Sequence, residues 1–114
     1  MFRMTDEIFN NVYWKIIQKI SFMQRVILIH SYLYYQLDNS VISDKEFDDA
    51  CKQYLTLVEN ANIVDLMYTD YFYAFKDFDG NTGFDLIYKL NKEDRNKIQT
   101  IANQIIRLKN GSIK

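Results

Sequence analysis

The 114-residue chain contains no proline and only three glycines, at positions 80, 83 and 111. Proline costs about 3 kcal/mol and glycine about 1 kcal/mol in the interior of a helix, so their scarcity favours helices over most of the chain. Apolar residues make up 48% of the sequence, which is enough for a buried core and argues against intrinsic disorder. We therefore expect an all-α protein that folds as a single compact helical domain over residues 1–114.

The chain has one cysteine, Cys51, and one histidine, His30. An internal disulfide is excluded, a zinc site built from Cys and His has too few ligands, and a catalytic triad would have to be built around His30 without an accompanying motif. The charged start, MFRMTDEIF, does not resemble a signal peptide, and no apolar run approaches the roughly 20 residues that cross a bilayer. We expect a cytoplasmic protein, without membrane contact, a bound metal or a required cofactor.

Apolar residues at spacings of three and four predict the longer helices. The first is capped by Thr5 and extends to about residue 20, Ser21 marks a bend or a boundary, and the second covers 22–37. A turn, DNSV, separates it from a third helix that begins with SDKE, a capping box at 43–46, and frays near residue 60. The last helix begins at Asn91 and ends at Gly111, with a buried stripe composed of Ile98, Ile101, Ala102, Ile105 and Leu108.

The segment between these helices is harder to assign. Residues 63–76 are rich in aromatic side chains, which suit a strand as well as a helix, and we expect a helix from the character of the whole chain. KDFDGNTG, at 76–83, is expected to be a loop. GFDLIYKL, at 83–90, is expected to be a short helix for which Thr82 is a plausible cap.

The loop carries Asp77, Asp79 and Asn81 at alternate positions, as a calcium-binding loop does. An EF-hand also needs glycine at its sixth position and a carboxylate at its twelfth, and here these are Thr82 and Tyr88. The EF-hand pattern therefore fails. The aspartates fit helix caps and turns, and a weak divalent-cation site stays open as the alternative.

The net charge of −1 hides an uneven distribution of charge. Residues 41–85 contain ten acidic and three basic residues, whereas residues 86–114 contain seven basic and two acidic ones. Both segments could simply be solvated helix faces. Alternatively, the acidic segment attracts a basic protein surface, and we name Asp65, Asp70, Asp77 and Asp79 as the candidate partner-binding residues.

The stretch YLYYQLDNSVISDKEFD, at 32–48, resembles the N-terminal helical domain of bacterial NAD-dependent DNA ligases. The likeness rests on the paired tyrosines, the turn, the capping box and the D-x-x-F-D spacing, and it extends over residues 22–59. It implies a helical hairpin that recognises nicotinamide mononucleotide (NMN), or the corresponding half of NAD. Residues 60–114 would then be a C-terminal helical extension.

Carried over by position, the ligand-contacting residues of that family fall on Tyr34, Tyr35, Asp44, Phe47 and Asp48. Aromatic rings can pack against a positively charged pyridinium ring, and carboxylates can accept hydrogen bonds from ribose hydroxyls. The alternative is that the aromatic rings only pack across a helical hairpin and that the two acids only favour the start of a helix.

The chain also departs from the ligase pattern. Phe47 replaces a tyrosine and Ser40 replaces a proline. The catalytic Lys-x-Asp-Gly motif is missing, since KDFDG, at 76–80, has one residue too many, and the adenylation and DNA-binding domains have no room. We therefore expect a non-enzymatic protein with no catalytic residues.

Two functions follow from these patterns. The first is a small binding protein for NMN or NAD. The second is an interaction protein that uses its acidic surface to block a host enzyme. Small, stand-alone proteins that resemble this ligase domain look like products of phages and mobile elements, so an inhibitor of a host defence nuclease, of the anti-CRISPR type, is the specific alternative. Direct nucleic-acid binding by the basic tail ranks last, because the tail lacks interleaved aromatic residues.

Overall fold

The structure is a computed structural model and describes residues 14–80 and 85–111. Within these ranges the chain forms helices and turns and no strand, which confirms the all-α prediction. The first half of the first expected helix, with its cap at Thr5, lies outside the described residues. Among the described helices, none is long and apolar enough to cross a membrane.

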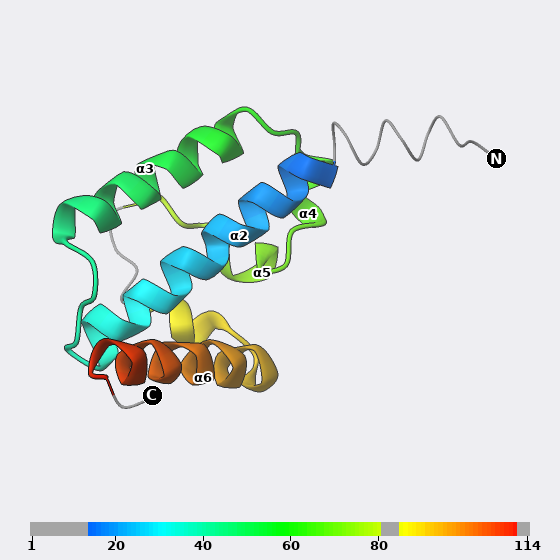
Figure 1. Cartoon of the computed structure of the whole chain (residues 1–114). Helices are drawn as coiled ribbons and strands as arrows, with labels where there is room; N and C mark the ends of the chain where they lie inside the picture. The colour runs from blue at the N-terminus through cyan, green and yellow to red at the C-terminus, as the bar shows by residue number, and fades with distance from the viewer. Residues whose placement is uncertain (1–13, 81–84, 112–114) are drawn as a thin grey trace.

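Helix α2 (Trp14–Ser31) is the central element, and it continues directly into a π-helical turn, η2 (Tyr32–Gln36). Helix α3 (Asp44–Glu59) follows after a turn and packs along α2, so the two form the expected helical hairpin (Figure 1). The shorter helices α4 (Ile63–Met67) and α5 (Phe72–Phe75) come next, then the 3-10 turn η3 (Leu86–Lys89). Helix α6 (Lys92–Lys109) closes the other side of α2.

Every described helix and helical turn, η2 included, contributes side chains to the core or packs against it. The fully buried apolar side chains are Ile20, Ile27, Leu28, Leu33, Cys51, Ala74, Leu86, Ile87, Leu90, Ile98 and Ala102, each 2% exposed or less. Burial raises the pKa of the Cys51 thiol to about 11, so this cysteine is a packing residue and not a reactive thiolate.

The predicted bend or boundary at Ser21 is wrong, because α2 passes through this position without interruption. A serine interrupts a helix when its hydroxyl competes for local backbone groups. Here the buried Ser21 hydroxyl instead accepts a hydrogen bond from the backbone N–H of Asp70, at 3.0 Å. The partner far along the chain removes the reason for a bend.

The starts of the two later long helices are confirmed. Ser43 and Glu46 form a reciprocal capping box at the start of α3. The side chain of Asn91 accepts a hydrogen bond from the N–H of Asp94 at the start of α6, at 2.8 Å, and Gly111 follows the end of that helix with φ of +72°.

The predicted stripe of α6 is only partly correct. Ile98 and Ala102 are fully buried, but Ile101 is 38% exposed and Leu108 is 61% exposed. The two exposed residues lie at the edge of the apolar arc, beyond the part that α2 and η2 cover.

Residues 63–76 contain two short helices in place of one. Asn62 caps α4, and the turn at Thr69 and Asp70 ends it. The expected helix at 83–90 is the single 3-10 turn η3, and the proposed cap Thr82 lies outside the described residues.

Candidate ligand-binding site

The π-helical turn η2 sets the position of the paired tyrosines. Its defining bond joins the N–H of Leu37 to the carbonyl of Tyr32, at 3.1 Å, so one residue more than usual is accommodated in the turn. Tyr34 and Tyr35 remain 42% and 40% exposed, and their rings meet edge to face with centroids 4.8 Å apart. Local π-helical turns are frequent at functional sites, because the extra residue redirects the side chains that follow.

The capping box sets the position of the acidic side of the site. The Ser43 hydroxyl accepts from the N–H of Glu46 at 3.0 Å, and the Glu46 carboxylate accepts from the N–H of Ser43 at 2.9 Å. These bonds fix the first turn of α3. Asp44, Phe47 and Asp48 then follow at i, i+3 and i+4, which places them on one face of the helix.

The end of α2, the turn after η2 and the start of α3 enclose a cavity of about 230 Å³. All five residues that the ligase resemblance names, Tyr34, Tyr35, Asp44, Phe47 and Asp48, line it. The complete lining is His30, Tyr34, Tyr35, Ser40, Ile42, Ser43, Asp44, Lys45, Phe47 and Asp48. The structure therefore gathers residues that are up to 18 positions apart, from His30 to Asp48, into one hollow.

Two chemically important lining residues were not predicted from the sequence as members of the site. His30 lies one helical turn before Tyr34, and its Nδ1 atom is buried with no hydrogen-bond partner among the described residues. Burial lowers the pKa of His30, although the nearby Glu46 carboxylate acts in the opposite direction, so the imidazole is neutral at pH 7. The sequence spacing could have predicted that His30 belongs to the site, since His30 precedes Tyr34 by four residues and such a pair shares one face of a helix.

Lys45 is the second residue that was missed, and it is the only lysine or arginine in the lining. Its ammonium group is exposed and pairs with the Asp49 carboxylate at 2.9 Å, and this hydrogen bond raises the pKa of Lys45. The pair is solvated, so Lys45 can easily exchange the Asp49 carboxylate for another anion.

The C-terminal part of the chain supports the rim of the cavity. The Lys109 ammonium group donates to the Asn39 side chain at 3.1 Å and to the Ser40 carbonyl at 3.2 Å. The Tyr88 hydroxyl donates to the side chain of Gln36 at 2.8 Å. Thus α6 supports the middle of the turn between η2 and α3, and η3 supports the last residue of η2, from which the turn begins.

The composition of the lining defines what it can bind. Three aromatic rings offer flat, electron-rich faces, and two carboxylates offer hydrogen-bond acceptors. Burial, followed by neighbouring groups, raises the pKa of Tyr35, so its hydroxyl stays protonated. A flat cationic ring joined to a group that carries hydroxyls matches this set.

The four acidic residues proposed for partner binding differ in their surroundings. Asp65 lies in the first turn of α4 and is only 8% exposed, so the prediction that it belongs to an open acidic surface is wrong. Its backbone N–H donates to the side chain of Asn62, the N-cap of α4, at 2.9 Å, and α4 packs against α2. Asp70 pairs with Arg25 at 3.3 Å, whereas Asp77 and Asp79 are exposed.

No protein-family model, no curated protein and no solved structure matches this chain. Among residues 14–80 and 85–111, no three His, Cys, Asp or Glu side chains are grouped so that they could hold a metal ion.

Proposed function

We propose that the protein is a small, non-catalytic module that binds a nicotinamide nucleotide, NMN or the corresponding half of NAD, in the cavity between η2 and α3. One observation carries the proposal. The five residues that the ligase resemblance selects from the sequence all line a single cavity, which was not required by their spacing alone.

The chemistry of each part of the ligand has a counterpart in the lining. The rings of Tyr34, Tyr35 and Phe47 suit the pyridinium ring. The carboxylates of Asp44 and Asp48 suit the ribose hydroxyls or the carboxamide. Lys45, at the edge, suits the phosphate.

The size of the cavity limits the affinity. Its volume of about 230 Å³ lies below the ~300 Å³ at which pockets for small molecules usually begin, so only part of a mononucleotide is enclosed. We therefore expect weak binding, with a Kd on the order of 10 µM to 1 mM.

The test is a titration with NMN, followed by the NMR shifts of the aromatic rings of Tyr34, Tyr35 and Phe47. Asp48→Ala should weaken binding by about 1.5–3 kcal/mol, since it removes a charged hydrogen-bond acceptor. The matched control is Asp77→Ala, an exposed aspartate outside the cavity lining, which should bind as the unmodified chain does. Phe47→Tyr should preserve or strengthen binding.

Millimolar NMN that moves none of the three rings would contradict the proposal. The alternative function, inhibition of a host defence enzyme by protein contact, would then take its place. Loss of binding in both aspartate variants would mean that general charge, and not the cavity, attracts the ligand.

A further inference from the structure

Helix α4 shows its apolar side to the solvent. Ile63, Val64, Met67 and Tyr68 are between 57% and 66% exposed, and we refer to these four residues as the α4 face. Short surface helices normally turn such side chains toward the core. In α4 only Leu66 packs against the core. An exposed cluster of large apolar side chains typically marks an interaction site.

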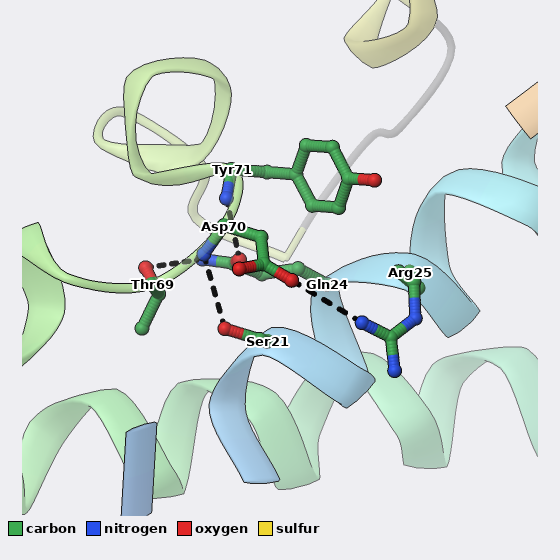
Figure 2. Close-up of polar contacts among 6 residues, drawn as sticks. All are labelled: Ser21, Gln24, Arg25, Thr69, Asp70 and Tyr71. Carbon is green, nitrogen blue, oxygen red and sulfur yellow. Dashed lines mark hydrogen bonds and ion pairs between the residues drawn. The ribbon is translucent and has the colours of Figure 1, made fainter. Parts of the chain in front are cut away.

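The α4 face is held in a fixed position by buried polar contacts to α2 (Figure 2). The Gln24 side chain donates to the Thr69 hydroxyl at 3.0 Å and accepts from the backbone N–H of Tyr71 at 2.9 Å. The Ser21 hydroxyl accepts from the N–H of Asp70 at 3.0 Å. Because these bonds anchor the turn after α4, little conformational freedom is lost when the face is covered.

A hollow lies on each side of the α4 face. On the Ile63 side, a cavity of about 180 Å³ has a mainly apolar lining that includes Val58, Leu66 and Phe78. On the Tyr68 side, a depression of about 450 Å³ is lined by Ile17, Gln18, Ser21, Arg25, Tyr68 and Asp70. The same surface therefore carries both protruding apolar side chains and hollows that can receive them.

The charges at the edge of this surface are also of both kinds. Arg25 and Asp70 pair within the chain, yet their side chains remain 38% and 56% exposed. A two-fold symmetric contact brings each surface against its own copy, so Arg25 of one copy can face Asp70 of the other. A strongly acidic partner would repel Asp70, and a strongly basic partner would repel Arg25.

We propose that the α4 face is a self-association surface, through which two copies of this chain form a two-fold symmetric dimer. The protrusions, the hollows and the paired charges are self-complementary, as such a contact requires. The surface lies near the start of α2, whereas the ligand cavity lies at its end, so the dimer leaves the cavity open (Figure 1). The proposal is independent of nucleotide binding.

The experiment is sedimentation velocity of the full chain over a range of concentrations. A small interface predicts a Kd on the order of 10 µM to 1 mM, so the sedimentation coefficient should rise with concentration toward that of a dimer. Met67→Glu should keep the chain monomeric. Leu108→Glu is the matched control, because Leu108 is equally exposed, at 61%, but lies on α6. Circular dichroism verifies that both variants remain helical.

A charge exchange makes the test specific for the two-fold arrangement. Arg25→Asp leaves only acidic charges at the edge, and Asp70→Arg leaves only basic ones, so each variant alone should fail to dimerise. An equimolar mixture should restore the dimer. A monomer at every concentration of the unmodified chain, equal behaviour of Met67→Glu and Leu108→Glu, or no recovery in the mixture would each overturn the proposal. If the unmodified chain is a monomer at every concentration, contact with a different protein takes the place of the dimer as the explanation of the α4 face.

Discussion

Replacing Gln24 by methionine tests how the buried polar contacts hold α4 and α5 on α2. Gln24 is 1% exposed, and methionine has a similar length and volume without the amide. The main loss is the acceptor for the buried N–H of Tyr71, which is left without a partner at a cost of about 1–3 kcal/mol. The other losses are smaller. Thr69 keeps its bond to the Leu66 carbonyl at 2.6 Å, and the contact of Gln24 with the Tyr54 hydroxyl is already long, at 3.5 Å.

We therefore expect the Gln24→Met variant to lose about 2–4 kcal/mol of unfolding free energy. This is a large part of the ~5–15 kcal/mol that stabilises a domain of this kind. The assay is urea unfolding followed by circular dichroism at 222 nm. Gln53→Met is the control, because it makes the same change on the exposed side of α3 and should alter stability by less than about 0.5 kcal/mol. A Gln24→Met variant as stable as this control would refute the reasoning, since it would mean that the N–H of Tyr71 does not depend on Gln24.

Two further predictions follow from individual groups. Burial lowers the pKa of His30 below its ordinary value of 6.5, so the unfolded chain binds this proton more readily than the folded chain. The free energy of unfolding should therefore be highest above about pH 6.5, where His30 is neutral in both states, and should fall as the pH drops below this value. The assay is the urea midpoint measured from pH 5 to 8, and His30→Gln should make this midpoint less dependent on pH. Ser43→Ala removes half of the capping box and should cost about 0.5–2 kcal/mol in the same assay, whereas an unchanged midpoint would show that the cap does not limit stability.

The parts of the fold that depend on local chemistry were predicted from the sequence. The start of α3 and the start of α6 follow from the side chains at Ser43, Glu46, Asn91 and Asp94, each of which bonds within three residues. Such contacts can be predicted from the spacing of the residues in the sequence. The all-α class follows from the scarcity of helix breakers, which is equally local.

The parts that depend on distant partners were not predicted. The sequence predicts a bend or a boundary at Ser21, whereas the role of this serine depends on Asp70, 49 positions later. The sequence predicts a surface charge at Asp65, since nothing near it in the sequence indicates that its side chain is buried. The π-helical form of η2 was also missed, since its extra residue has no characteristic sequence signal.

The candidate site joins these two kinds of information. Its α3 side is local, since the capping box places Asp44 and Asp48, but its η2 side depends on contacts from the far end of the chain. Lys109 holds the turn through Asn39 and Ser40, 70 and 69 positions earlier. A hairpin of residues 22–59 alone would therefore have the right side chains without the support that holds the rim of the cavity. The C-terminal extension thus supports the candidate site, because Lys109 on α6 donates hydrogen bonds to the turn that joins its tyrosines to its carboxylates.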